Sequence, residues 1–353
     1  MRKIFLGIGA GPIQTGIFVS GAWHGNFDRI VLSEVDPAIV AAIRRAGSIT
    51  VNTAGVGFQS FDRVEVYNPT VLEDANKLKE VAAEAIAVNT ALPSVDFYRF
   101  AAPYLAEGFA KSKHAKYVYT SENSTTAAEE LRRTVGEFPD VYYLDTVIGK
   151  MSKVFNAADS DLPPLAPGSP KGHLVEVFNT IYSSSAAGIE DVGIEGLFPK
   201  PDLHPFEEAK LYGHNAVHFL LGVLAAEAGL CTMDEAAAHP ELMAIAHNAL
   251  IDECGAALCR KYAGVDDYFI PGNFRAWGEE LLNRMVSPEL ADSVERIIRD
   301  PNRKLGWNDR LIGAIHLCFS QKIVPCNLLT AIIVLQNQVD WKNLTQKWST
   351  EIA

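Results

Sequence analysis

A glycine-rich turn near the start of the chain constrains the fold more than any other feature. A short apolar run, residues 3–9, leads into Gly9-Ala10-Gly11-Pro12-Ile13-Gln14-Thr15-Gly16, and apolar residues follow. This is the order strand, glycine turn, helix, in which the backbone can approach a pyrophosphate at a helix N-terminus. Gln14 stands where the third glycine of a dinucleotide fingerprint would be. The residues that we expect to contact a dinucleotide in this turn are Gly9, Gly11, Pro12, Ile13 and Gln14.

The second expected strand ends on an acid. Residues 29–34 read Arg-Ile-Val-Leu-Ser-Glu, so that Glu34 lies at the end of the strand. An acid in this place suits the ribose hydroxyls of NAD and repels the additional phosphate of NADP, so we expect NAD as the cofactor. Asp36-Pro37 is instead typical of a helix N-cap followed by proline at the first helical position.

The pattern of the chain changes near residue 200. Up to that point strands and helices alternate, which predicts a Rossmann-like α/β domain with a doubly wound, mostly parallel sheet. Residues 159–172 hold four prolines and two glycines and are expected to form an irregular loop before a strand at 174–178. Helical patterns dominate afterwards. We therefore expect a nucleotide-binding domain over residues 1–200 and a mostly α-helical domain over residues 201–353.

Composition narrows the possible functions. The chain has 353 residues, 48% of them hydrophobic, and a formal net charge of −12. This charge argues against general binding to nucleic acid or to an anionic membrane, so an anionic substrate would need a local basic patch. The chain contains no run of 18 apolar residues, so the sequence predicts no membrane-spanning helix. The five cysteines lie in the second half without a CxxC motif, which is typical of buried free thiols in a reducing cytoplasm.

The candidate catalytic residues open the helical half of the chain. Lys210, Asn215 and His218 precede and enter an apolar run that ends near Ala226. In an α-helix Asn215 would lie about 140° and His218 about 80° around the axis from Lys210, on one broad face. A desolvated lysine is a base, an Asn amide can donate to an alkoxide, and a neutral His can donate or accept. Together they could deprotonate an alcohol and hold the resulting oxyanion.

Two further groups of polar residues have both a structural and a functional interpretation. Ser121-Glu122-Asn123 ends a strand; Asn123 either helps to cap the following helix or donates to a substrate oxygen. Between residues 299 and 310 lies a basic turn that contains Arg303, Lys304 and Arg310. Such charges are commonly solvated, but in an acidic chain they are candidates for binding a phosphate or carboxylate.

These motifs together resemble the polyol-specific long-chain dehydrogenases, most closely the mannitol-1-phosphate 5-dehydrogenase branch. The family signature is Lys, four residues, Asn, two residues, His, as at Lys210, Asn215 and His218. The turn 9–16 is similar to the family's glycine turn, and Ser121-Glu122-Asn123 looks like its Cys-Glu-Asn strand end. Residues 294–312 look like its Arg-Lys-Leu and Asp-Arg-Leu segment. The resemblance extends from end to end, although only these islands are specific.

The resemblance implies metal-independent, NAD-linked oxidation of a secondary alcohol, reversible as ketose reduction. Lys210 would be the general acid/base, Asn123 and Asn215 would bind the reacting oxygen, and His218 would orient the substrate. Glu122 and Asn123 would also border the cofactor. Arg303 and Lys304, with Arg310 and His214 as further candidates, would bind the rest of the substrate. The protein would be a monomer or small homo-oligomer.

The sequence departs from the family pattern in two places. Gln14 replaces a turn glycine. The family's Asp-Arg pair after the sixth strand has no Asp here, where the chain reads Ile148-Gly149-Lys150-Met151-Ser152. The second departure bears on whether the substrate is mannitol 1-phosphate, because that loop borders the family's active site.

Three other functions remain open at this point. The first is a sugar-acid reductase of the fructuronate or tagaturonate kind, in which the basic patch meets a carboxylate. The second is a metal hydrolase using His214 and His218, four residues apart, with His204, Glu207 and Glu208 nearby. The third is a nucleotide-binding protein without catalysis.

Overall fold

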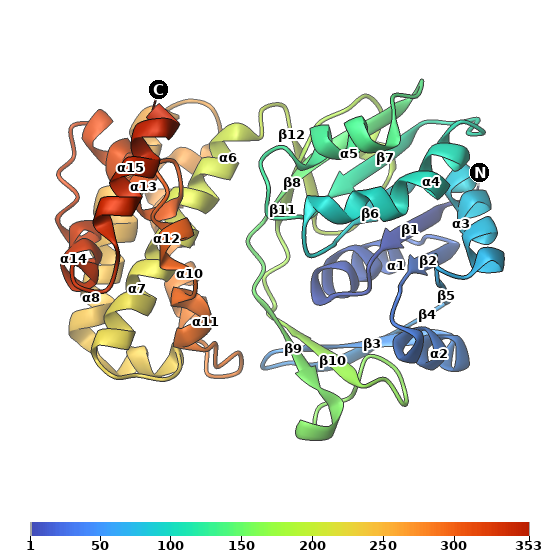
Figure 1. The fold of residues 1–353 in the computed structure, drawn as a ribbon, viewed down its shortest axis with the longest axis horizontal. Helices are drawn as coiled ribbons and strands as arrows, with labels where there is room; N and C mark the ends of the chain where they lie inside the picture. Colours follow the sequence, from blue (N-terminus) through green and yellow to red (C-terminus); the bar gives the residue numbers. More distant parts are fainter. Residues whose placement is uncertain (1, 353) are drawn as a thin grey trace. The chain divides into compact units, whose positions relative to one another are not determined.

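The protein is built from two compact units, Met1–Leu203 and His204–Ala353. The computed structural model describes the backbone of residues 2–352 and the side chains of residues 2–350 (Figure 1). Each unit has its own core and its own candidate residues, and each is described separately below.

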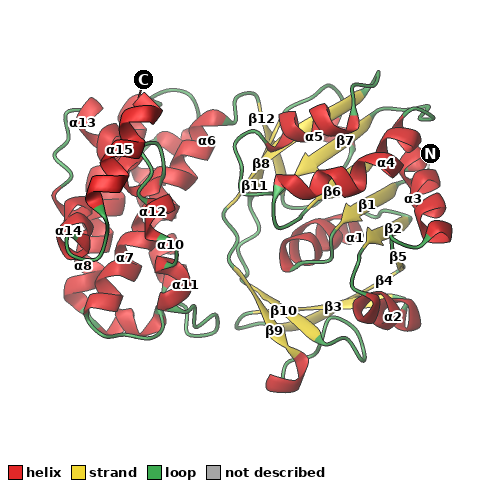
Figure 2. Cartoon of the chain, in the orientation of Figure 1, coloured by secondary structure: helices red, strands yellow, loops and turns green. Residues whose placement is uncertain are grey.

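The first unit is organised around an eight-stranded sheet with the order β12-β11-β8-β7-β6-β1-β2-β5 (Figure 2). Its neighbouring strands are parallel except for the antiparallel pair β8–β11. From β5 to β8 the strands follow the 3-2-1-4-5-6 order of dinucleotide-binding folds. The predicted doubly wound, mostly parallel sheet is therefore confirmed. The strands are β1 (Ile4–Ile8), β2 (Arg29–Ser33), β5 (Val64–Tyr67), β6 (Ala87–Thr90), β7 (Lys116–Thr120), β8 (Val141–Ile148), β11 (Ile181–Ser184) and β12 (Leu197–Lys200).

Both faces of this sheet are buried, because side chains alternate along each strand. Phe5 of β1 belongs to one core cluster, whereas Leu6 and Ile8 belong to the other. The cluster of Leu6 is completed by α3 (Leu72–Glu84), α4 (Tyr98–Phe109) and α5 (Ala127–Val135). The cluster of Phe5 is completed by the π-helix η1 (Gln14–Val19), α1 (Ser20–His24), α2 (Pro37–Ala46) and a second sheet.

The second sheet has four strands in the order β4-β3-β10-β9. They are β3 (Ser48–Thr53), β4 (Gly57–Asp62), β9 (Ser152–Asn156) and β10 (Lys171–Val175). The predicted strand at 174–178 was therefore placed three residues too late, because β10 pairs with β9 from Lys171 onward. Short 3₁₀ turns, η2 (Val95–Phe97), η3 (Ala157–Asp159) and η4 (Ile189–Asp191), complete the unit.

The helix after β2 begins and ends as its sequence predicts. The Asp36 carboxylate accepts hydrogen bonds from the N–H groups of Ala38, at 2.9 Å, and Ile39, and Pro37 is the first helical residue. Gly47 ends α2 with a positive φ of 63°, a conformation that costs glycine little. The helix begins three residues after Glu34, and the N–H of its N-cap residue Asp36 donates to the Glu34 carboxylate.

The second unit is helical throughout, as predicted. A continuous helix, Pro240–Lys261, is long and apolar enough to cross a membrane by length and composition alone, but 61% of its most apolar window is buried inside the unit. We interpret it as a core helix. The elements are α6 (His204–Glu208), η5 (Ala209–Asn215), α7 (Ala216–Glu227), η6 (Asp234–Ala238), α8 (Pro240–Asn248), η7 (Ala249–Gly255), α9 (Ala256–Lys261), η8 (Asp267–Phe269), α10 (Pro271–Met285), α11 (Val294–Ile298), α12 (Pro301–Lys304), α13 (Arg310–Ser320), α14 (Cys326–Leu335) and α15 (Trp341–Ile352).

The cysteines are all free, but they are not all buried as expected. Cys254, Cys259 and Cys318 lie in the core of the second unit, whereas Cys231 and Cys326 are exposed. Cys231 lies in the loop after α7 and Cys326 is the first residue of α14, and the cysteine spacing on which the prediction rested carries no information about burial at these places.

Candidate active site

The glycine turn of the first unit leaves room for a ligand at its tip. Gly9 has a φ of +88°, and a Cβ there would lie 2.7 Å from the carbonyl oxygen of Ala91, so only glycine fits. A Cβ on Gly11, by contrast, would meet no atom within 4 Å. This open space, next to Pro12 and Ile13 at the start of the helical segment, is suited to the close approach of a pyrophosphate.

Gln14 is fully buried, and its amide is directed into the sheet. Its Oε1 accepts a hydrogen bond from Asn89 Nδ2 at 2.8 Å. A Cβ on Gly7 of β1 would lie 2.4 Å from Gln14 Nε2 and 2.7 Å from its Cδ. The third fingerprint glycine normally permits close helix–strand packing. Here the glycine lies on the strand side of that contact, at Gly7, and the larger residue lies on the helix.

The Glu34 carboxylate is hydrogen-bonded to the backbone around it. It accepts from the N–H of Ala10 in the glycine turn at 2.9 Å and from the N–H groups of Val35 and Asp36 at 2.8 and 2.9 Å. A carboxylate offers about four acceptor positions, so that one remains for a ligand hydroxyl. Glu34 therefore both shapes the glycine turn and keeps limited capacity to bind a ribose.

Glu122 is a buried anchor that supports the turn before Asn123. Its carboxylate accepts hydrogen bonds from Thr90 Oγ1 (2.9 Å), Leu92 N (2.8 Å), Tyr98 OH (2.5 Å) and Ser121 N (3.1 Å). These four bonds use its acceptor capacity. The predicted direct contact between Glu122 and the cofactor stays a prediction; the structure shows Glu122 holding the turn.

Asn123 itself is exposed at the end of this turn. The next helix, α5, has Thr126 as its N-cap residue and receives no side-chain cap. The N–H of Ala128 instead donates to Asp145 Oδ1 at 2.9 Å. Asn123 therefore does not cap α5, and its predicted contact with a substrate oxygen stays a prediction.

In the second unit, the α-helical geometry assumed for residues 210–218 is wrong in its first half. Ala209–Asn215 form a π-helix, closed by hydrogen bonds between residues five apart, and α7 begins at Ala216. Residues five apart stack on a π-turn, and residues three apart share a face of an α-turn. The spacing of Lys210, Asn215 and His218 therefore suits a π-turn followed by an α-turn, which aligns them more closely than an α-helix would.

The pKa of Lys210 is lowered toward neutral pH. Burial, together with the positive charge of Arg310, lowers the pKa of its ammonium group to about 8, although Glu207 acts in the opposite direction. Among the residues that the structure describes, none forms a hydrogen bond or ion pair with the Lys210 or Asn215 side chain. Both side chains are partly exposed and so can meet a ligand.

The two histidines beside Lys210 are neutral at physiological pH. Burial, followed by the charge of nearby residues, holds the pKa of His214 well below 6.5. Burial also lowers the pKa of His218 to about 4, although the Asp292 carboxylate acts in the opposite direction. Their ring centroids are 5.9 Å apart. The buried Nε2 of His218 has no hydrogen-bond partner in the described part of the chain. An unpartnered buried ring nitrogen is suited to bind a ligand hydroxyl.

The basic residues of the predicted patch differ from one another in burial. The Arg303 side chain is 51% exposed and pairs with Asp300 at 3.1 Å. The Arg310 side chain is 13% exposed, and its Nε donates to Asp309 at 2.9 Å. Lys304 is buried, donates from Nζ to the carbonyl oxygen of Ile297 at 2.6 Å, and has a pKa lowered to about 8 by burial and by neighbouring arginines.

The positive charge of Arg310 acts both on Lys304 and on Lys210 with its neighbouring histidines. Arg310 lowers the pKa values of Lys210, His214, His218 and Lys304. The structure thus brings Lys210, His214, His218, Arg303 and Lys304 into one electrostatic cluster around Arg310, in which Asp300 and Asp309 pair with the two arginines. The basic side chains of this cluster are suited to bind an anionic group.

The ligands that a metal hydrolase would need do not converge. Glu208 accepts hydrogen bonds from Lys261 and Tyr262, at 2.7 Å each to its Oε2. His204 Nδ1 lies 3.7 Å from Glu207 Oε2, and His204 Nε2 lies 3.5 Å from Glu208 Oε1. Within residues 2–352, no group of three His, Cys, Asp or Glu side chains is placed to hold a metal ion.

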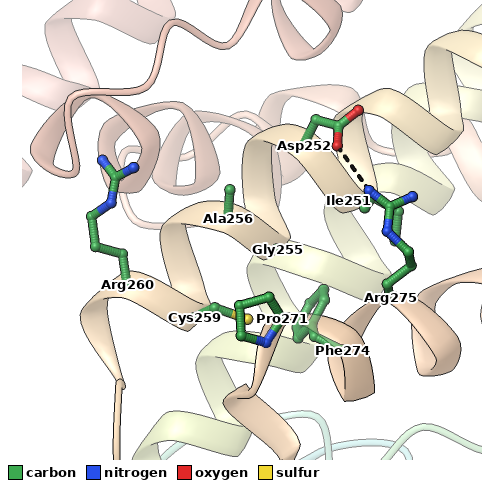
Figure 3. A pocket seen from close by; sticks show the side chains of 9 residues that line it. All are labelled: Ile251, Asp252, Gly255, Ala256, Cys259, Arg260, Pro271, Phe274 and Arg275. Carbon is green, nitrogen blue, oxygen red and sulfur yellow. Dashed lines mark hydrogen bonds and ion pairs between the residues drawn. The ribbon is translucent and has the colours of Figure 1, made fainter.

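Two pockets are lined by residues other than the predicted catalytic ones. One, of about 290 Å³ in the first unit, is lined by polar groups that include Lys150, Glu176 and Asn179, which sequence reasoning had not selected. The other, of about 380 Å³ in the second unit, lies over Gly255 and Ala256 (Figure 3). Figure 3 shows Arg275 paired with Asp252 on its rim, at 3.3 Å. Neither pocket includes Lys210, Asn215 or His218.

Comparison with known proteins shows which proteins this chain is similar to. Residues 202–342 match the family described as mannitol dehydrogenase C-terminal domain. The mannitol-1-phosphate 5-dehydrogenase of Bacillus velezensis is 28% identical over 347 residues, which cover 96% of this chain and 88% of that protein. The enzyme of the same name from Bacillus subtilis is 27% identical, over 88% of this chain and 82% of that protein.

Solved structures of similar proteins share the fold. The Pseudomonas fluorescens mannitol 2-dehydrogenase, in a ternary complex with NAD and D-mannitol, is 13% identical with a TM-score of 0.68, over 95% of this chain and 78% of that one. A substrate-free D-sorbitol dehydrogenase, also 13% identical, has a TM-score of 0.71 over 94% and 79% of the two chains. The second unit therefore matches the family of the mannitol dehydrogenase C-terminal domain, and the resemblance of the whole chain to the polyol-specific long-chain dehydrogenases is confirmed.

Proposed function

We propose that this protein catalyses the NAD-dependent, reversible oxidation of a secondary alcohol of a polyol or polyol phosphate to the ketose. The observation that carries the proposal is the Lys210 ammonium, whose pKa is lowered to about 8 on the helix face that also presents Asn215 and His218. The sequence similarity to mannitol-1-phosphate 5-dehydrogenases supports the substrate class.

The first unit fits NAD as the cofactor. Gly9 and Gly11 give the backbone approach that a pyrophosphate needs, and the open space at Gly11 is where a side chain would block it. Glu34 retains one acceptor position for a ribose hydroxyl and would repel a phosphate on that ribose. When bound, NAD would accept the hydride from the alcohol carbon and return it in the reverse direction.

The residues of the second unit would handle the proton. Neutral Lys210 would take the hydroxyl proton as the alcohol C–H bond breaks, and protonated Lys210 would return it to the ketose oxygen. The Asn123 and Asn215 amides would donate to the reacting oxygen, as the family resemblance implies. His218 Nε2, neutral and unpartnered, would bind a neighbouring hydroxyl, with His214 beside it. The chemistry would need no metal ion.

The basic cluster would bind the anionic end of a substrate. Arg303 is the most accessible of its members and so the best candidate for a direct phosphate contact. Arg310 would add a second guanidinium. Lys304 would act mainly through its buried charge, because its ammonium group already donates to Ile297.

A sugar-acid reductase activity is the second candidate. The same arginines would bind a carboxylate as well as a phosphate. The specific observation in its favour is the sequence after β8, where Gly149 stands in place of the family's Asp. That loop continues into Lys150, whose Nζ donates to Asn179 at 3.2 Å.

We further propose that the protein is cytoplasmic and is a monomer or small homo-oligomer.

The test is NADH oxidation, followed at 340 nm, with a panel of fructose 6-phosphate, other ketose phosphates, fructuronate, tagaturonate and free fructose. Turnover with a ketose phosphate is the expected result and would assign the basic cluster to phosphate. Turnover only with uronates would support the second candidate. Tight NADH binding without turnover on any member would contradict both and favour a binding protein.

A further inference from the structure

A chain of three polar side chains crosses the sheet of the first unit from the glycine turn to the turn that precedes Asn123. Gln14 Oε1 accepts from Asn89 Nδ2 at 2.8 Å, and Asn89 Oδ1 accepts from Ser121 Oγ at 2.8 Å. Gln14 and Asn89 are fully buried, and Ser121 is partly exposed. The strands in between, β1, β6 and β7, are adjacent in the sheet.

The hydrogen bonds all run in one direction along the chain, because each side chain donates to the one that follows it from Ser121 to Gln14. Ser121 donates, the Asn89 amide both accepts and donates, and Gln14 accepts. Rotating both amides would reverse the direction but would again leave one end of the Gln14 amide without a partner. In the orientation observed, that end is Nε2, which is buried without a partner in the described part of the chain.

This orphaned nitrogen is informative about why a glutamine occupies the position. A buried amide donor without a partner costs free energy that an apolar side chain of similar length would avoid. Filling the space next to Gly7 would therefore be done better by methionine. The feature that only the amide supplies is the acceptor Oε1, which holds Asn89.

Ser121 is the donor end of the chain and lies two residues before Asn123. Its backbone N–H donates to Thr90 O at 2.9 Å and to the Glu122 carboxylate at 3.1 Å, and its Oγ donates to Asn89. The Glu122 carboxylate also accepts from Tyr98. The turn before Asn123 is thus held by two sets of hydrogen bonds that meet at Ser121, of which one leads back to the glycine turn.

We propose that Gln14, through Asn89 and Ser121, is a positioning residue for Asn123, so that the residue replacing the third fingerprint glycine helps to set the geometry of the reacting oxygen. This inference rests on the proposed function. It gives Gln14 a role other than contact with the pyrophosphate, and it gives Asn89 a role that no sequence motif indicates.

The test compares Ser121→Ala and Gln14→Met with Ser124→Ala as the matched control. Ser124 lies in the same turn, but its hydroxyl contacts only the exposed residue Thr126 among the described residues, at 3.2 Å from the Thr126 hydroxyl and 3.3 Å from the Thr126 N–H, and so stands outside the chain of Gln14, Asn89 and Ser121. We expect each of the first two variants to lower kcat about five- to tenfold, the size expected for the loss of one buried hydrogen bond. The dissociation constant of NADH, measured by fluorescence, should change less than about twofold.

The combined variant distinguishes positioning from a general loss of stability. If the three side chains act as one unit, Gln14→Met/Ser121→Ala should have nearly the kcat of either single variant. Ser121→Thr, which keeps the hydroxyl, should restore kcat. A Ser121→Ala enzyme with the kcat of Ser124→Ala would overturn the proposal, as would unchanged kcat combined with a lower melting temperature.

Amide hydrogen exchange tests the same chain without turnover. Faster exchange of residues 121–124 in Ser121→Ala and Gln14→Met, but not in a variant at an exposed site such as Glu137→Gln, is the expected result. Faster exchange in a protein that turns over no substrate would keep the structural chain and reject the proposed function. Unchanged exchange together with normal kcat would reject the chain itself.

Discussion

The candidate residues of the two units differ in how many hydrogen bonds they form with the rest of the protein. In the first unit, the carboxylates of the predicted cofactor residues Glu34 and Glu122 accept three and four hydrogen bonds from protein groups. In the second, Lys210 and Asn215 hold no hydrogen bond with the described residues, and His218 keeps a buried nitrogen without a partner. The first arrangement is typical of a preformed binding surface, and the second of groups kept available for a reacting molecule.

This difference predicts that substitutions of these residues should lower stability in the first unit and turnover in the second. Replacing a saturated carboxylate leaves donors unpaired in the folded protein and should cost stability. Replacing an unpartnered functional group removes nothing that holds the fold and should cost turnover alone. The following predictions test that separation, from the largest expected effect to the smallest.

Lys210→Met should lower kcat about 10³-fold, the contribution expected of a general acid/base, while NADH binding and melting temperature stay close to those of the wild type. The matched control is Lys261→Met, because Lys261 pairs with Glu208 on the surface at 2.7 Å. Steady-state kinetics and a thermal melt of both variants provide the measurement. Normal turnover in Lys210→Met would remove Lys210 from the mechanism.

Glu122→Gln should show the opposite pattern, with a loss of about 3 kcal/mol in the free energy of unfolding, because an amide cannot accept from all four donors. Glu137→Gln is the control: Glu137 is 78% exposed and pairs with Arg132 at 3.2 Å, so its loss should cost less than about 0.5 kcal/mol. Denaturant unfolding compares the two. Equal stabilities would show that the Glu122 network contributes nothing.

Gly7→Ala should destabilise the first unit by about 1–3 kcal/mol, since the new Cβ would lie within 3 Å of Gln14 and Leu32. Gly11→Ala meets no atom within 4 Å and should keep the melting temperature while weakening NADH binding. Gln14→Gly in the Gly7→Ala background should recover part of the lost stability. A Gly7→Ala protein as stable as the wild type would contradict the glycine exchange between strand and helix.

Arg303→Ala should raise KM for an anionic substrate about tenfold and leave kcat within about twofold, because the accessible guanidinium contributes to binding. Lys304→Met should instead lower stability, since its ammonium group is buried against Ile297. These neighbouring residues thus form an internal comparison. An unchanged KM in Arg303→Ala would remove that residue from the site.

Much of the fold follows from local signals in the sequence. The glycine turn, the Asp36-Pro37 helix start and the alternation of strands and helices each reflect short-range chemistry, and the structure confirms them. The second sheet escaped prediction as a separate layer because β10 pairs with β3 and β9 across long sequence separations. Periodicity within one strand carries no information about such partners.

The sequence selects Lys210, Asn215 and His218 as candidates by residue type and spacing, and their roles stay predictions. Their alignment depends on a π-turn that the α-helical wheel could not represent. The five-residue spacing from Lys210 to Asn215 was the available signal, since five is the period of π hydrogen bonds. The burial of Lys304 and the contact between Gln14 and Gly7 depend on tertiary packing, which no local pattern reports.

The most direct test of the central claim is the pH dependence of kcat in both directions with a substrate of the panel. Ketose reduction needs protonated Lys210 and should decline as pH rises through about 8, whereas alcohol oxidation needs the neutral amine and should rise through the same value. Mirror-image profiles that meet near pH 8, and that are absent from the residual activity of Lys210→Met, are the predicted result. Profiles that are flat across this range, or that persist in Lys210→Met, would contradict the assignment of Lys210 as the acid/base.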